Sequence, residues 1–173
     1  MNLSQLLSQQ TRDAYDWTHK LLDSIPISQW EQTPDILDTN VIWQAGHLLM
    51  SHYFHAIMVI SGHRKDIISQ IPLREYNGFF TAGDPRKVLG QCDPESLRAQ
   101  LKQVQQATIE EIDKLSETDL QQPLEPTPTP HPIAKTKYEA IDWNIKHTMW
   151  HCGQLGTLKR VIGEPYNFGL RPS

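Results

Sequence analysis

Cysteine is scarce in this chain of 173 residues, which contains only Cys92 and Cys152. The two lie far apart and match no zinc-binding spacing. Two isolated cysteines are typical of a reduced compartment rather than of a disulfide framework. The segment from Met1 to Gln5 lacks a positively charged stretch followed by an apolar one, so we expect no signal peptide. Together these absences favour a cytoplasmic protein.

Clustered basic residues and long hydrophobic runs are also missing. The formal net charge is −4 at pH 7, and the nearest candidate for a basic cluster is His63-Arg64-Lys65. Because a nucleic-acid-binding surface requires a stripe of lysine and arginine, nucleic acid is not expected as a partner. The longest apolar-leaning run, from Leu48 to Ile60, is too short to span a bilayer and contains two histidines. We therefore expect no membrane partner either.

Several catalytic signatures are absent as well. The chain has no glycine-rich loop that would cradle a phosphate and no Gly-x-Ser-x-Gly turn that would expose a nucleophilic serine. Thr148 follows His147 at the position where a zinc protease of the His-Glu-x-x-His type would have its glutamate. The Glu-x-x-His pattern of di-iron bundles is missing too. None of these four chemistries is therefore indicated.

Helical periodicity, by contrast, is strong in four stretches of the chain. Apolar residues recur at helical spacing from Leu3 to Leu21 and stop before Pro26, and a second stripe runs from Trp43 to Met58. The ends of the other helices are marked by polar N-caps, a proline in a first turn, a capping box and C-terminal glycines. These signals delimit the second helix by Thr39 or Asn40 and Gly62, the third by Asp93-Pro94 and Leu115, and the fourth by Thr136, Glu139 and Gly163.

No stretch alternates with a period of two residues, so we predict an all-α fold in a single domain over residues 1–173. Residues 63–92 form a long connection with room for a short helix, and such a link is unusual unless it crosses the bundle or builds a site. A long crossover between the second and third helices lets these two run parallel in a four-helix bundle. The proline-dense segment from Leu124 to Pro132 is expected to be extended, in the polyproline II conformation.

Three histidines provide the strongest functional signal. His147 and His151 are four residues apart, so in a helix they lie one turn apart on the same apolar face. His47 lies in the apolar stripe of the second helix, one turn after Trp43. A metal ion is one partner that satisfies several buried imidazoles at once. The pattern therefore favours a three-histidine site with an open coordination position for water or substrate.

The pattern alone leaves an alternative open, because each histidine is also compatible with an ordinary core or interface position. Gln154 returns to almost the same azimuth as His147, and Asn144 lies one turn before it, so both are candidates for contacting a substrate or supporting the ligands. Trp43 is a candidate wall of the pocket. The other histidines are weaker candidates: we expect His52 to point elsewhere, His55 to border the stripe, His131 to lie in the proline-rich loop and His19 to be solvated.

Two segments are similar to the motifs of a known family: Trp43-Gln44-Ala45-Gly46-His47-Leu48, and His147-Thr148-Met149-Trp150-His151-Cys152-Gly153-Gln154-Leu155, which matches an H-x₃-H-x-G-Q-[LI] signature. Through them the chain resembles the DinB/YfiT-like metal-dependent four-helix bundles. The resemblance implies an up-down-down-up bundle, often dimeric. It also implies one divalent ion, commonly zinc or nickel, held by His47, His147 and His151.

Some members of this family are thiol-dependent S-transferases or isomerases. The resemblance thus implies a metal-dependent transferase that joins a small-molecule thiol to a small electrophile. The metal would favour the thiolate near neutral pH and orient it. Two alternatives stay open: a metal-dependent hydrolase, for which no carboxylate base is identifiable beside the ligands, and a non-catalytic metal-binding stress or interaction protein. The expected partners are a thiol or electrophile and a second copy of the chain.

Overall fold

The computed structural model of the chain describes residues 2–169, which form helices joined by turns and loops and contain no β-strand. The four longest helices are α1 (Leu3–Asp23), α2 (Val41–Tyr53), α6 (Pro94–Asp113) and α8 (Lys137–Ile162). The short elements are η1 (Ile27–Gln29), η2 (Phe54–Met58), α3 (Val59–Ser61), α4 (Lys65–Ile68), α5 (Leu73–Phe80), η3 (Pro85–Val88) and α7 (Glu117–Leu120). The prediction of an all-α fold is confirmed.

The caps of the long helices are the ones that the sequence indicates. Asn40, not Thr39, caps α2, and its side-chain oxygen accepts a hydrogen bond from the backbone N–H of Trp43 at 2.9 Å. Asp93 caps α6 in the same way, with proline in the first turn. Thr136 and Glu139 form the expected capping box at the start of α8. Because each cap satisfies backbone N–H groups that the helix itself leaves unpaired, these residues define where the helices begin.

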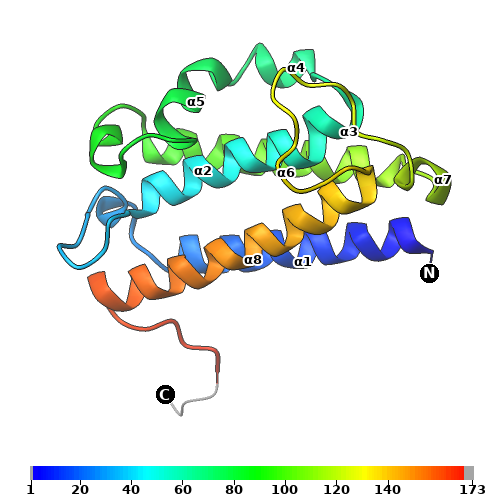
Figure 1. Cartoon of the computed structure of the whole chain (residues 1–173). Helices are drawn as coiled ribbons and strands as arrows, with labels where there is room; N and C mark the ends of the chain where they lie inside the picture. The colour runs from blue at the N-terminus through cyan, green and yellow to red at the C-terminus, as the bar shows by residue number, and fades with distance from the viewer. Residues whose placement is uncertain (1, 170–173) are drawn as a thin grey trace.

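The long helices pack against one another along much of their length (Figure 1). α1 contacts α8 and α6, while α2 contacts α6 and α8. The up-down-down-up arrangement implied by the family resemblance stays a prediction. None of the helices formed by residues 2–169 combines the length and apolar character that crossing a lipid bilayer requires.

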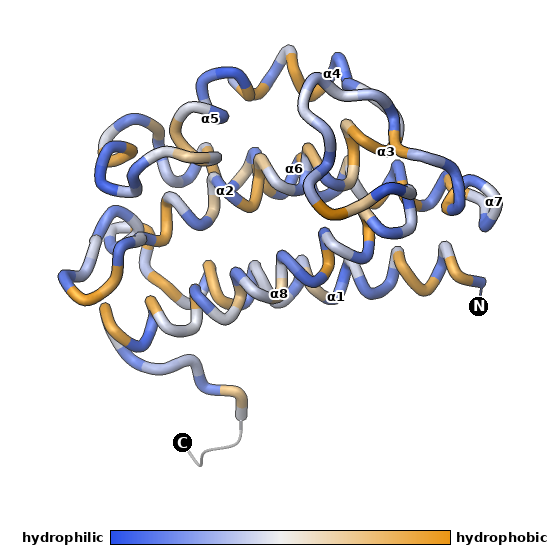
Figure 2. Tube along the Cα trace, viewed as in Figure 1, coloured by the Kyte–Doolittle hydropathy of each residue, from blue (hydrophilic) through white to orange (hydrophobic). Residues whose placement is uncertain are grey.

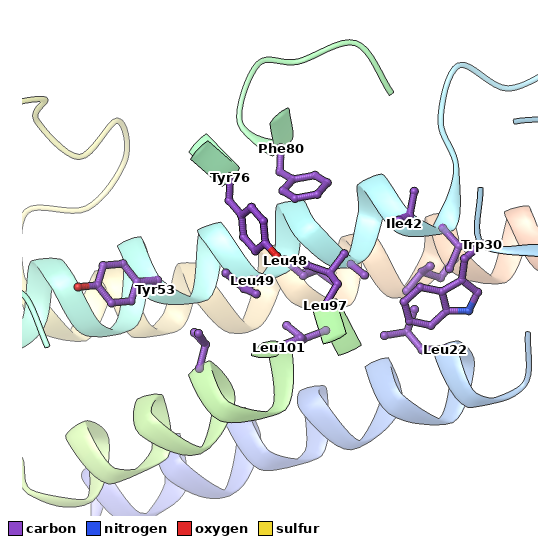
Figure 3. Close-up of a cluster of buried hydrophobic side chains, with 14 of the residues drawn as sticks. Leu22, Trp30, Ile42, Leu48, Leu49, Tyr53, Tyr76, Phe80, Leu97 and Leu101 are labelled. Carbon is purple, nitrogen blue, oxygen red and sulfur yellow. The ribbon is translucent and has the colours of Figure 1, made fainter. Parts of the chain in front are cut away.

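Burial of apolar side chains between these helices stabilises the fold. Hydrophobic residues recur among hydrophilic ones along each helix, as expected for helices that present one face to a core (Figure 2). The larger of two buried clusters joins α1, α2, α5, α6 and α8, and Figure 3 shows part of it, including Leu22, Trp30, Leu48, Phe80 and Leu97. The smaller cluster gathers residues of α1, α3, α6, α7 and α8.

The long connection between α2 and α6 holds more structure than a single short helix, because α4, α5 and η3 all lie within residues 63–92. α5 packs on α2, with Phe80 directed toward Leu48 (Figure 3). A Cβ added at Gly46 would overlap the Phe80 ring, so only glycine permits this close approach. Residues 124–132 contain no helix or strand. The connection therefore anchors α5 against the part of α2 that carries His47.

Candidate metal centre

His47 of α2 meets His147 and His151 of α8, as the sequence predicts. The potential ligand atoms of these three histidines all lie within 4.8 Å of one another. The ring centroid of His47 is 5.3 Å from that of His147 and 4.8 Å from that of His151. The Nε2 atoms of His147 and His151 are 3.0 Å apart. Three imidazoles from two helices thus surround one point.

Hydrogen bonds orient two of the three rings. Nδ1 of His47 donates to the backbone carbonyl of Phe80 at 2.7 Å, and Nδ1 of His151 donates to the side-chain oxygen of Gln44 at 2.5 Å. A hydrogen on Nδ1 leaves the lone pair on Nε2, which is the arrangement that a metal ligand needs. Nδ1 of His147 is buried and has no hydrogen-bond partner among residues 2–169, but the ring stacks on Trp143.

All three imidazoles are neutral at pH 7. Burial is the largest cause and lowers the pKa of His147 to about 4 and that of His151 to about 3, with smaller contributions from the neighbouring histidines. Burial also lowers the pKa of His47, although its hydrogen bond to Phe80 acts in the opposite direction. Neutral imidazoles have free lone pairs, so the group is ready to bind a cation without first releasing protons.

The donor set fits a divalent transition metal. Three imidazole nitrogens suit zinc or nickel, and within the described residues the group includes no carboxylate or thiol. Three protein ligands leave at least one coordination position open, which is typical of metal sites that bind an exogenous molecule. An ion held this way keeps its full positive charge, because neutral ligands do not compensate it.

Trp43 lies against the centre, next to His47. Its ring stacks on His47 with centroids 4.8 Å apart and an interplanar angle of 15°. The indole N–H donates to the backbone carbonyl of Gly83 at 3.1 Å, so the connection between α2 and α6 holds the tryptophan in place. Its role toward a substrate stays a prediction.

Gln154 and Asn144 occupy different surroundings. Gln154 accepts a hydrogen bond at 2.7 Å from the side-chain N–H of Gln44, so it is linked to His151 through Gln44. Gln154 also lines a surface hollow of about 400 Å³ together with Leu37, Thr39, Trp150, Gly153 and Thr157. Asn144 is fully buried, and its amide donates to the hydroxyl of Tyr15 at 3.0 Å. The structure thus relates Gln154 to the centre and directs Asn144 toward α1.

Gln44 is the site residue that the sequence analysis missed. It is fully buried although it is polar, and it connects His151 to Gln154. Its third hydrogen bond is with the hydroxyl of Thr39. The available signal was its spacing, because a residue three positions before His47 lies on the same helical face. An uncharged polar side chain in an otherwise apolar stripe requires a partner.

The histidines outside the centre have other hydrogen-bond partners. His52 points away from the centre, as expected, and its Nε2 lies 3.0 Å from the hydroxyl of Thr148. The expectation that His19 is solvated is wrong, since it is half-buried and hydrogen-bonded to Gln105 of α6 at 2.5 Å. His55 and His131 are in contact with each other, at 2.7 Å between Nδ1 and Nε2 respectively. The proline-rich loop therefore folds onto η2.

The protein is therefore an all-helical one, in which three neutral histidines from two helices converge on a candidate metal centre. The family model described as DinB superfamily matches residues 10–155, which include all three histidines. The chain belongs to the DinB superfamily, whose members are typically metal-binding. A search of curated proteins finds no match.

Proposed function

We propose that the protein binds one divalent ion, zinc or nickel, through His47, His147 and His151, and that it acts as a thiol S-transferase on small electrophiles. The observation that supports this proposal is the convergence of three neutral imidazoles, one buried and two half-buried, which as three ligands leave a coordination position open. A bound divalent ion supplies a positive charge that favours the thiolate form of a thiol near neutral pH.

The residues of the chain favour an anionic ligand at this position. No acidic side chain belongs to the histidine group in the described part of the chain, so nothing there competes with a thiolate for the positive charge. Trp43 and Trp143 stack on His47 and His147 and exclude water from one side of each ring. Exclusion of water strengthens electrostatic interactions at the centre.

In the proposed transfer, the sulfur attacks an electrophilic carbon and a carbon–sulfur bond forms. The leaving group departs with the electron pair of its bond to that carbon, and the proton of the thiol passes to solvent. The chain therefore needs to bind and orient the thiol and to keep competing water away. It needs no general base of its own, because the thiol has already lost its proton when it attacks.

Metal analysis of His147→Ala and His151→Ala tests the centre itself. We expect each variant to lose the ion while circular dichroism shows unchanged helicity, since the three ligands act together. His63→Ala is the matched control, because His63 is exposed and pairs with Tyr53 outside the cluster. Metal retention in both ligand variants would contradict the assignment.

Single-turnover assays test the reaction. Metal-loaded protein is mixed with a panel of low-molecular-weight thiols and 1-chloro-2,4-dinitrobenzene, and thiol consumption is followed. Metal-dependent thiol consumption supports the transferase. Ester cleavage without thiol would instead indicate a hydrolase, and metal binding with neither reaction would indicate a non-catalytic binding protein.

A further inference from the structure

Two histidines outside the proposed ligand set extend the cluster. His55 lies on the π-helical turn η2, and its ring centroid is 5.7 Å from that of His147, in an edge-on arrangement. His131 comes from the loop before α8, and its ring centroid is 4.8 Å from that of His55. These two rings form a continuous row with the metal centre, and the proposed function gives them no role.

Backbone hydrogen bonds determine which nitrogen of His131 carries hydrogen. Nδ1 of His131 accepts from the backbone N–H of Ile133 at 3.2 Å and from that of Ala134 at 2.8 Å. In a neutral imidazole one nitrogen accepts and the other donates, so the hydrogen of His131 is on Nε2. Nε2 of His131 lies 2.7 Å from Nδ1 of His55 and donates to it.

The same reasoning assigns the hydrogen of His55. Because Nδ1 of His55 accepts from His131, the hydrogen of His55 is on Nε2. This Nε2–H makes no hydrogen bond with any of residues 2–169, and Nε2 is not among the fully buried polar atoms, so solvent reaches it although His55 is only 7% exposed. A donor near His147 therefore lacks a partner within the described chain and is available to a bound ligand.

The π-helical turn brings His55 close to the centre. In a regular α-helix, His55 would lie about 80° around the axis from His47. A π turn closes its hydrogen bonds from residue i to i+5, so each residue advances less around the axis. His55 is thereby rotated back toward the face of His47, where it contacts His147. Such turns occur frequently at functional sites.

We propose that His55 binds the exogenous ligand of the metal centre, donating its Nε2–H to an anionic or sulfur acceptor at the open coordination position, and that His131 is a positioning residue that holds His55 in this tautomer. The inference rests on the proposed metal centre and adds a specificity element to it. A ligand with an acceptor atom gains this hydrogen bond and one without it does not, so the site favours the former.

Spectroscopic titration of the cobalt(II)-loaded protein with 2-mercaptoethanol tests this inference. Cobalt(II) absorption reports the ligand environment without requiring turnover, and elemental analysis reports metal content. In His55→Leu we expect unchanged metal content and a dissociation constant for 2-mercaptoethanol raised about tenfold, the usual effect of losing one charge-assisted hydrogen bond. His55→Gln restores an N–H donor at a similar reach, so we expect it to recover much of the affinity.

A variant of His131 acts on the tautomer of His55. His131→Leu removes the donor to Nδ1 of His55 without touching the ligand, so we expect a smaller loss of affinity and unchanged metal content. His63→Leu is the matched control, since His63 is an exposed histidine outside the row.

The outcomes separate the two proposals. Wild-type ligand affinity in His55→Leu at full metal content would overturn the inference and leave the proposed metal centre intact. Loss of metal in both His55→Leu and His55→Gln would overturn it too, because His55 would then support the ligands. Failure of the wild-type protein to bind cobalt, zinc or nickel would overturn the proposed function itself.

Discussion

Single hydrogen bonds decide how the imidazoles of this protein are presented. Gln44 accepts from His151 and donates to Gln154, so one amide side chain links a proposed ligand to a residue that lines a surface hollow. The backbone carbonyl of Phe80 accepts the corresponding hydrogen bond from His47. Partners of this kind set the tautomer and the ring orientation of a metal-binding histidine.

Gln44→Leu should weaken metal binding by about 10- to 100-fold, the usual effect of removing the hydrogen-bond partner of a ligating histidine. The reason is that His151 loses its acceptor and becomes free to change tautomer. Competition with a chromophoric chelator measures the affinity. Gln103→Leu, on a half-buried residue paired with Gln70 and outside the centre, is the control, and equal affinity in the two variants would contradict the role of Gln44.

Gln154→Ala should retain the metal and weaken binding of the exogenous ligand. Gln154 contacts no histidine of the centre directly, but it lines the hollow next to Trp150 and holds Gln44. Titration of the metal-loaded variant with a small thiol gives the ligand affinity. An unchanged dissociation constant would remove Gln154 from the site.

At the scale of secondary-structure elements, the centre depends on how α5 packs against α2. Gly46 lies next to His47 in the sequence, and the Phe80 ring occupies the space where a side chain at position 46 would lie. Phe80 is fully buried, and its carbonyl orients His47. Packing and metal binding therefore share one contact between these two helices.

Gly46→Ala should lower the free energy of unfolding by about 1–3 kcal/mol, as is usual for overpacking a core. The added methyl group would displace Phe80 and with it the acceptor of His47, so metal affinity should fall as well. Urea denaturation and metal titration measure the two effects.

Gly156→Ala is the matched control for this substitution. Gly156 also lies within a long helix, but a Cβ there meets nothing within 4 Å. Because alanine favours helix more than glycine does, this variant should be as stable as the wild type or slightly more stable. Equal destabilisation of both variants would argue against the proposed contact.

For the molecule as a whole, the buried histidines make stability depend on pH. Burial lowers the pKa of His55 and that of His151 to about 3, whereas these groups in the unfolded chain titrate near 6.5. Above pH 6.5 both states are neutral at these positions. As the pH falls below 6.5, the unfolded chain takes up protons that the folded chain excludes, so folding becomes less favourable.

The metal-free protein should therefore lose stability between about pH 6.5 and 3, by at most about 1.4 kcal/mol per pH unit for each of these two histidines. Urea denaturation at a series of pH values measures this slope. His151→Leu removes one of the two groups and should flatten it. A slope that is the same in both proteins would show that His151 does not remain neutral in the folded state.

Metal removal should lower the melting temperature of the whole molecule. An ion that binds the folded state and not the unfolded one stabilises it by about 4 kcal/mol at a free concentration a thousand times the dissociation constant. Adding zinc or nickel to metal-free protein should raise the melting temperature until one equivalent is bound, and a chelator should reverse the change. A melting temperature independent of metal would contradict the proposed centre.

The sequence by itself determined the four long helices and the identity of the three central histidines. Caps such as Asn40 and Thr136 act on backbone groups a few residues away, and the spacing of His147 and His151 sets their common face, so both are short-range properties. Long-range packing alone decided which groups hold the rings. Gln44, the carbonyl of Phe80 and His131 reach their histidines from distant parts of the chain, and His19 is covered by Gln105 because α1 packs on α6. The π turn that rotates His55 toward His147 was likewise visible only in the tertiary structure, because no local spacing of residues predicts it.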